Sequence, residues 1–584
     1  MANAADGGLA QTQKVGALSY SLGSYEKPVK DLLNTLKSNK FTSRLWARDA
    51  KLWTGEDEDK WLGWLLVVTE QIKNQAQFDK LSQTIKERKF THAVLLGMGG
   101  SSLCVEVMRQ VFGKHPEHPE MIVLDSVVPA QVEAARAQID PAKTVFIVAS
   151  KSGSTTEPNV LCQYFYDETK KVVGDKVGEH FIAITDPGSS MEKRAQDWKF
   201  AHIFHGVPSI GGRFSALSNF GMIPAAVMGI NTAELLKHAE SMVKACGADA
   251  APEHNPGVML GTIMGTLTEE GRDKVTIIAS PAIHSLGTWL EQLIAESTGK
   301  DDRGIIPVAS ETLADPAVYG EDRLFVYVRL ESEADREQDK KVEALEKAGN
   351  PVVKIALPDK LHLGAEFFRW EIATATGGAI IGINAFNQPN VQESKDFTKE
   401  YLKEYETKGA LPTNTLLFEE GIFKLYADEA NTKTFKEETA EPSAKGYLAT
   451  HLAQLDPGDY FGINAYIECV PRLEEKLQKI RDLVMKKHQV ATTVGFGPRF
   501  LHSTGQLHKG GPNTGVFLQI TCDDKKDLAI PGEKFGFSVL KEAQSLGDFK
   551  ALSSRRRRLL RVHLPADIDA ALDKLYELVK EITA

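Results

Sequence analysis

From His92 onward, short apolar runs rich in β-branched residues alternate with longer stretches of helical periodicity. This alternation is typical of βαβ units, in which helices join parallel strands and cover both faces of one sheet. Runs that are apolar throughout indicate strands buried on both faces. The runs that we predict as strands are 93–96, 121–124, 144–149, 181–185, 275–279, 324–328, 352–357, 460–467, 490–494 and 516–521. The sequence therefore predicts an α/β fold built of doubly wound parallel sheets.

The chain of 584 residues is too long for one hydrophobic core, and the alternation is interrupted twice. A polar stretch separates the first block from the second, and a charge-rich stretch separates the second from the third. We predict a helical N-terminal segment, two doubly wound domains, a polar connector and a C-terminal α/β unit. Their respective boundaries are 1–85, 86–245, 255–400, 401–458 and 459–584.

Charge and cysteine usage narrow the class of protein. A net charge of −10 argues against a nucleic acid or another polyanion as the main partner. The five cysteines are odd in number and widely scattered, which favours reduced thiols and a cytoplasmic location. The N-terminus lacks the basic and apolar regions of a secretory signal, and no apolar run is long enough to span a bilayer.

Hydroxyl side chains follow the predicted strand 144–149. Ser150, Ser152, Ser154, Thr155 and Thr156 lie where this strand passes into a helical pattern. Such a turn presents free backbone N–H groups and the positive end of the helix dipole, and hydroxyls add further donors. The turn is therefore a candidate phosphate site. The alternative is a cluster of helix N-caps, although capping needs only one such hydroxyl.

A second turn of this kind, Gly97-Met-Gly-Gly-Ser-Ser102, follows the predicted strand 93–96. Two such turns at neighbouring strand ends are expected to face one ligand across the crevice of the sheet. A dinucleotide site is the alternative, with Asp125 holding a ribose. We disfavour it because Ser102 stands where the dinucleotide fingerprint has a glycine that permits close helix packing.

Two further stretches carry residues suited to chemistry. Arg213 follows paired glycines, which let the backbone pass close to a ligand, so a fixed planar cation is expected beside that ligand. An Arg–carboxylate pair at a domain edge is the alternative.

Gln292 and Glu296 lie four residues apart on one face of a predicted helix that stops at Gly299. In the last turn the helix dipole disfavours the carboxylate anion, which suits a group that accepts and releases a proton; a solvated glutamate is the alternative.

The loop between the predicted strands 490–494 and 516–521 is rich in glycine and contains His502 and His508. These two histidines are a candidate metal pair. No cysteine or carboxylate stands at a spacing that would complete the site, so we favour acid/base work.

Taken together, five segments resemble the motifs of the glucose-6-phosphate isomerase family, which is built of sugar-isomerase (SIS) domains. The segments 97–103, 150–157, 211–218, 291–300 and 386–395 stand in the order of that family. The stretch 495–520 is most similar to the isomerase half of the bifunctional transaldolase/glucose-6-phosphate isomerases. The resemblance implies that the two doubly wound domains are of SIS type.

The resemblance also implies roles for individual residues. The sugar phosphate would be held by Gly100, Ser101, Ser150, Lys151, Ser152 and Thr155. Gln292 and Gln388 would line the sugar. Glu296 would be the base, Arg213 would stabilise the intermediate, and Lys395 and His502 would open the sugar ring. His502 is preferred to His508 because Leu501-His-Ser-Thr-Gly-Gln506 is similar to the histidine loop of the family.

The implied activity is reversible isomerisation of glucose 6-phosphate and fructose 6-phosphate through a cis-enediolate, without a metal or organic cofactor. The resemblance favours a homodimer, and mannose 6-phosphate is a further candidate substrate. Two alternatives stay open. One is a bifunctional enzyme with transaldolase activity, for which a barrel of about 250 residues has no room before Gly97. The other is a non-catalytic sugar-phosphate sensor, which would need the phosphate turns but not Glu296, Lys395 and His502.

Overall fold

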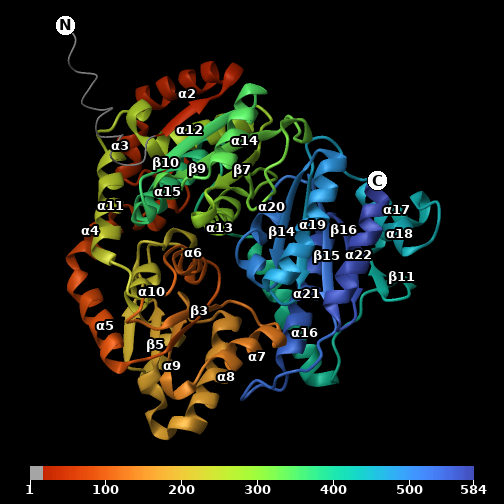
Figure 1. Cartoon of the computed structure of the whole chain (residues 1–584), viewed down its shortest axis with the longest axis horizontal. Coiled ribbons are helices and arrows are strands. Elements are labelled where there is room, and N and C mark those ends of the chain that lie inside the picture. Colours follow the sequence, from red (N-terminus) through yellow and green to blue (C-terminus); the bar gives the residue numbers. More distant parts are fainter. Residues whose placement is uncertain (1–17) are drawn as a thin grey trace.

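Three sheets, each flanked by helices, make up this computed structural model, which describes residues 18–584 (Figure 1). The N-terminal stretch inspected above for a secretory signal lies outside these residues. The α/β fold with parallel sheets is confirmed. In the part of the chain described, no helix is long and apolar enough to cross a lipid bilayer.

The first sheet is entirely parallel, with the strand order β3-β2-β4-β5-β6. Its strands are β2 (His92–Gly97), β3 (Glu120–Leu124), β4 (Thr144–Ala149), β5 (Phe181–Thr185) and β6 (His202–His205). The helices of this first unit are α4 (Trp64–Lys73), α5 (Gln75–Arg88), α6 (Leu103–Phe112), α7 (Pro129–Gln138), α8 (Thr156–Val173), α9 (Ser190–Asp197), α10 (Asn219–Met228) and α11 (Thr232–Ala245). Strand β4 is buried along its whole length, as its unbroken apolar run predicts.

The second sheet has the order β1-β10-β9-β7-β8 and is parallel except for β1, which lies antiparallel on β10. Its strands are β1 (Leu18–Ser21), β7 (Lys274–Ala279), β8 (Ile306–Val308), β9 (Arg323–Leu330) and β10 (Val352–Leu357). The helices of this unit are α2 (Glu26–Ser38), α3 (Phe41–Trp46), α12 (Pro256–Glu269), α13 (Leu286–Thr298), α14 (Arg336–Lys347) and α15 (Leu363–Ile380). The segment before residue 85, predicted as mostly helical, thus also gives the edge strand β1.

The third sheet has the order β11-β12-β16-β15-β13-β14. Its strands are β11 (Leu416–Glu420), β12 (Phe423–Tyr426), β13 (Tyr460–Tyr466), β14 (Ala491–Phe496), β15 (Gly515–Cys522) and β16 (Arg558–Leu564). The helices that follow the second unit are α16 (Val391–Lys408), α17 (Glu429–Glu438), α18 (Ala444–Leu452), α19 (Pro471–His488), α20 (Gly505–Gly510), α21 (Phe537–Ser554) and α22 (Ile568–Thr583).

The stretch 401–458, predicted as a polar connector, differs from that expectation. It contributes the antiparallel strands β11 and β12 to one edge of the third sheet. Of these two strands only β11 lies at the edge, because β12 also pairs with β16. β11 ends in the exposed Glu419 and Glu420, and such charged residues help an edge strand to resist pairing with other chains.

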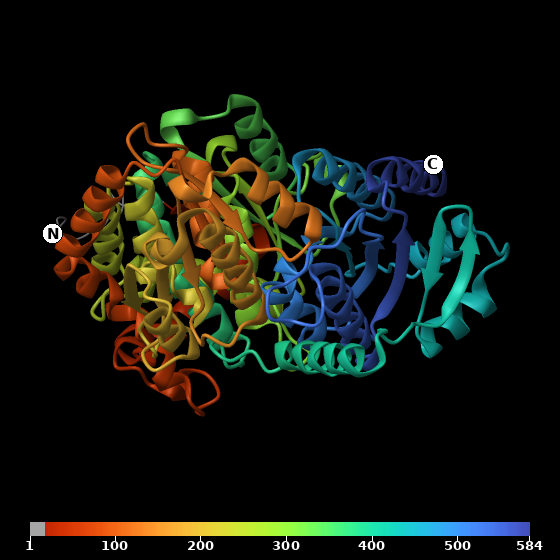
Figure 2. The same ribbon diagram turned by 90° about the horizontal axis from the view of Figure 1, so that it is seen from below.

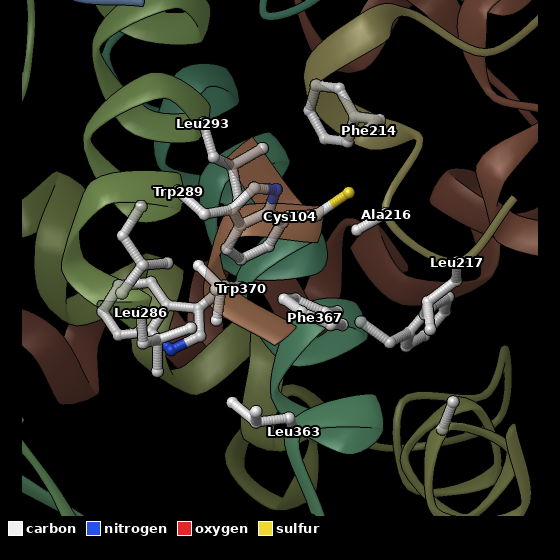
Figure 3. Packing of buried hydrophobic residues seen from close by; sticks show 14 of the residues in the cluster. Cys104, Phe214, Ala216, Leu217, Leu286, Trp289, Leu293, Leu363, Phe367 and Trp370 are labelled. Atoms are coloured by element: carbon white, nitrogen blue, oxygen red, sulfur yellow. The ribbon is translucent and has the colours of Figure 1, made fainter. Parts of the chain in front are cut away.

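A shared hydrophobic core joins the first two units (Figure 3). Trp289 and Leu293 of α13 are buried beside Phe367 and Trp370 of α15, and the rings of Trp289 and Phe367 meet edge to face with centroids 4.9 Å apart. Phe214 of the first unit belongs to the same core. The apolar face of α13 is thereby fixed, and its polar face is held toward the junction of the units.

Helix α16 links the second unit to the third. It packs against α21, and a side chain at Gly547 would lie 2.8 Å from the Thr398 hydroxyl, so the two helices approach closely. In Figure 2, α16 runs along the third unit. Leu402 of α16 also belongs to one hydrophobic cluster with residues of β2 and β4, so α16 contacts the first unit as well as the third.

Candidate active site

The hydroxyl turn, residues 150–156, connects the carboxyl end of β4 to α8. Thr155 is the N-cap of α8 by its extended backbone, but its side chain makes no capping hydrogen bond. The Ser152 and Ser154 hydroxyl oxygens lie 2.9 Å apart, and the Ser150 hydroxyl is buried without a partner in the described chain. Because side chains do not cap the helix, its first N–H groups and the hydroxyls are available to an anion.

A cavity of about 130 Å³ opens beside this turn. Segments that are distant in sequence line it: the hydroxyl turn, α16, the loop around His502, and Gln544 of α21. Its lining thus comes from the first unit, from the link helix and from the third unit. Lys395 lies on the α16 wall and is exposed.

His502 faces Glu157 across this cavity. Its Nε2 atom lies 2.9 Å from Glu157 Oε1, and Gln544 Nε2 donates to the same oxygen at 2.6 Å. Burial alone would raise the pKa of Glu157, but the adjacent His502, with a smaller contribution from Lys395, lowers it to about 2. Glu157 is therefore an anion that fixes the imidazole.

Glu157 and Gln544 were not among the predicted site residues. A signal for Glu157 exists in the sequence, since a carboxylate in the first turn of a helix is favoured by the dipole. No comparable signal marks Gln544, which reaches the site only because α21 packs beside α16.

Gln292 joins this histidine loop to Glu296. Its Nε2 atom donates to Glu296 Oε2 at 3.0 Å and to the backbone carbonyl of His502 at 2.8 Å. Its Oε1 atom is buried and has no hydrogen-bond partner in residues 18–584. Glu296 lies in the last turn of α13, as predicted.

Arg213 lies buried on the other side of Glu296. Its NH1 atom lies 3.4 Å from Glu296 Oε1 and donates to Gln388 Oε1 at 3.0 Å. Its Nε atom donates to the Ser297 hydroxyl at 2.7 Å, and NH2 donates to two backbone carbonyls of 385–387. Arg213 thereby fixes the Glu296 carboxylate, the Gln388 side-chain amide and the backbone of 385–387 relative to one another.

A buried lysine, Lys300, holds the same backbone. Lys300 Nζ donates to the carbonyls of Asn384 and Asn387, at 2.6 and 2.5 Å, and is 1% exposed. Burial, followed by the charge of Arg213, lowers the pKa of Lys300 well below its usual value. No role was predicted for this lysine, although it ends the segment 291–300.

The glycine turn approaches both the arginine and the histidine. A Cβ atom on Gly100 would lie 2.0 Å from the Gly212 carbonyl oxygen, and one on Gly99 would lie 2.7 Å from the His502 carbonyl. Side chains are therefore excluded at both positions. Ser101, the next residue, is 8% exposed in the same turn.

The side chains of two candidate residues, Lys151 and His508, are engaged with other parts of the protein. The Lys151 ammonium is paired with Asp186 and donates to the Pro208 carbonyl at 3.2 Å, so its charge is already compensated. His508 is 3% exposed between Phe500 and Phe517, and burial lowers its pKa well below the usual value. It lines a separate cavity of about 680 Å³.

The dinucleotide alternative conflicts with the position of Asp125. This carboxylate is fully buried, accepts from the Ser102 hydroxyl at 3.1 Å and pairs with Arg499 at 2.7 Å. It is therefore occupied by the protein and is not presented to a ribose.

Comparison with known proteins gives sequence relatives. Residues 67–323 match the family model described as phosphoglucose isomerase. The chain is 28% identical over 413 residues to the glucose-6-phosphate isomerase of Carboxydothermus hydrogenoformans, covering 62% of this chain and 88% of the relative. It is 26% identical over 387 residues to that of Staphylococcus epidermidis, covering 59% of this chain and 86% of the relative.

Solved structures share the fold. The hypothetical protein TT0462 of Thermus thermophilus superposes with a TM-score of 0.57 and 24% identity, over 66% of this chain and 99% of that one. A glucose-6-phosphate isomerase of Chlamydia trachomatis superposes with a TM-score of 0.55 and 18% identity, over 69% of this chain and 92% of that one.

Proposed function

We infer that this chain, which carries a region of the phosphoglucose isomerase family, is a glucose-6-phosphate isomerase. One observation of the geometry supports this most strongly. The hydroxyl turn, His502, Gln292, Glu296 and Arg213 form one connected set, linked by the contacts of Glu157 and of the Gln292 amide. A phosphate seat, an acid/base pair and a fixed cation thus lie around one site.

The phosphate of the sugar binds at the hydroxyl turn in this proposal. Ser152 and Thr155 offer hydroxyls, and the start of α8 offers backbone N–H groups. Lys151 then contributes through its backbone, because its ammonium is paired with Asp186. Binding here orients the other end of the sugar and lowers the entropic cost of the reaction.

Ring opening requires proton transfer at the ring oxygen and at the C1 hydroxyl. His502 and Lys395 lie on the wall of the cavity beside the hydroxyl turn. Glu157 holds the imidazole through Nε2 and leaves the other ring nitrogen for the substrate. We assign the ring-opening pair to these two side chains.

Isomerisation moves a proton between C2 and C1, and one carboxylate can serve both carbons from one face. Glu296 takes this role, with its orientation fixed by Gln292 and Arg213. The intermediate is a cis-enediolate whose charge develops on oxygen. Arg213 is rigidly held beside Glu296, so its guanidinium stabilises that charge without reorganisation. Gln292 Oε1 is an unused acceptor for a sugar hydroxyl.

Substitution of Glu296 tests the proposal. Glu296→Gln is expected to reduce kcat by about 10²–10⁴ in a coupled assay of glucose 6-phosphate formation. Binding of substrate, measured by its effect on the melting temperature, is expected to persist. Glu291→Gln is the matched control, because it makes the same change on the same helix at a residue that lines the other cavity. Turnover by Glu296→Gln at the wild-type rate would remove Glu296 from the mechanism.

The same assay separates the alternatives. A sugar-phosphate sensor would bind without turnover in the wild-type chain. The bifunctional enzyme has no structural support, since the described residues form three open sheets and no closed barrel of eight parallel strands. A homodimer and activity on mannose 6-phosphate remain predictions of the resemblance.

A further inference from the structure

Two histidines and an aspartate meet between α11 and the start of α15, away from both cavities described above. His238 lies in α11. Asp359 is the N-cap of the short 3₁₀ helix η12 (Lys360–His362), and His362 is the last residue of η12, which leads into α15. One nitrogen from each ring and one carboxylate oxygen lie within 4.8 Å of one another. Within residues 18–584, no other three side chains of these types bring ligand atoms so close.

Close packing of two helices produces this cluster. A Cβ atom on Gly364 would lie 2.1 Å from the Leu235 carbonyl oxygen, so the glycine allows α11 and α15 to touch. Figure 1 shows these helices side by side. His238 follows Leu235 by three residues, on the same face of α11. The imidazoles of His238 and His362 consequently lie against each other, with ring centroids 3.8 Å apart and ring planes tilted by 34°.

The aspartate is held in place by the backbone. Asp359 Oδ1 accepts from the Leu361 N–H at 2.9 Å, which caps η12, and lies 3.0 Å from His362 Nδ1. His362 is 7% exposed, whereas His238 is half-buried. Two of the three groups are therefore preorganised.

Two imidazoles and one carboxylate are a set that suits Zn²⁺, which takes nitrogen and oxygen ligands at about 2.0–2.2 Å in a tetrahedron. Ligand atoms in such a tetrahedron lie about 3.3 Å apart, so the 3.0 Å pair needs little change. All separations lie within 4.8 Å, so a movement of at most about 1.5 Å brings each pair of ligand atoms to the tetrahedral distance.

The charged groups around the cluster are of both signs. Glu234 and Lys237 lie beside His238, and Glu366 lies beside His362 and pairs with Arg369.

We propose that His238, Asp359 and His362 bind one Zn²⁺ ion, with water in the fourth position. The ion joins α11 of the first unit to the start of α15. The other end of α15 leads to residues 384–388, which Arg213 and Lys300 hold. Zn²⁺ here stabilises the junction of the two units and takes no part in the chemistry.

The test is titration of ZnCl₂ into the full chain after removal of metals with a chelator, followed by calorimetry and by the melting temperature. One ion per chain and a raised melting temperature are expected. His238→Ala and Asp359→Asn are expected to weaken binding by about tenfold or more. The asparagine keeps an acceptor for the Leu361 N–H, so that variant retains its helix cap.

His254→Ala removes an exposed histidine outside the cluster and is the matched control, with Zn²⁺ binding expected to equal that of the wild type. The proposal is overturned if the wild-type chain takes up no Zn²⁺ at millimolar concentration. It is also overturned if the His238 and Asp359 variants bind as tightly as the His254 variant, since binding would then be adventitious.

Discussion

His502 Nε2 lies 2.9 Å from Glu157 Oε1, although 345 residues separate them in the chain. This contact joins the third unit to the first at the mouth of the proposed site. Both partners are largely buried, so neither is replaced easily by water. Removing one partner of such a pair leaves the other buried without a hydrogen-bonding partner, which lowers the stability of the protein and no longer fixes the orientation of the remaining side chain.

Glu157→Gln is therefore expected to impair turnover without touching Glu296. The neutral amide no longer fixes the His502 imidazole as a charged partner, and we expect kcat for glucose 6-phosphate to fall by about 10²–10⁴. Asp167→Asn, an exposed change on the same helix, is the control and should leave kcat unchanged. Wild-type turnover by Glu157→Gln would contradict a role for this contact in positioning His502.

The same carboxylate makes stability depend on pH. Its pKa falls from 4.5 to about 2 on folding, which corresponds to about 3 kcal/mol of stabilisation. Because the folded pKa is the lower one, this contribution is complete above the unfolded value and is lost as the pH falls from about 4.5 to about 2.

Denaturant unfolding of the wild type and of Glu157→Gln across this range measures the effect. The difference between their free energies of unfolding should shrink as the solution becomes more acidic. A difference that is constant across this range would show that Glu157 is not an anion stabilised by His502.

The close packing of the glycine turn at Gly100 gives a further prediction, for which Gly211 offers a control. Gly100→Ala places a methyl group 2.0 Å from the Gly212 carbonyl, so the turn or Arg213 must move. We expect a loss of about 1–3 kcal/mol in stability together with a lower kcat/KM. At Gly211 the added methyl meets nothing within 4 Å, so Gly211→Ala should behave as the wild type. Equal activity of the two variants would show that the close approach is not needed.

Lys300→Met tests the buried lysine. The change leaves the Asn384 carbonyl without its donor, whereas the Asn387 carbonyl keeps the bond from Arg213. We expect destabilisation of about 1–3 kcal/mol for the unsatisfied carbonyl. The loosened segment carries Gln388, so KM for the sugar phosphate should rise. Lys347→Met, on the exposed face of α14, is the control. Unchanged KM and melting temperature in Lys300→Met would rule out this holding role.

Much of the fold follows from local pattern. Strands β4 and β5 begin and end where their apolar runs do, because a strand buried on both faces leaves no room for polar interruption. The short strands β8, β11 and β12 were not predicted. β8 pairs with β7, and the hairpin of β11 and β12 joins the sheet through β16, so their place depends on neighbours that are distant in the sequence.

The sequence by itself determined the kinds of chemistry available: a hydroxyl turn before a helix, glycines at close approaches, and a carboxylate at a helix end. These features depend on neighbours within a few residues. Only the tertiary structure decided which groups meet. His502 and His508 lie six residues apart, yet the first faces Glu157 and the second is buried between Phe500 and Phe517. The reason is physical: the packing of three units around one junction fixes the direction of each side chain, and no local pattern encodes that direction.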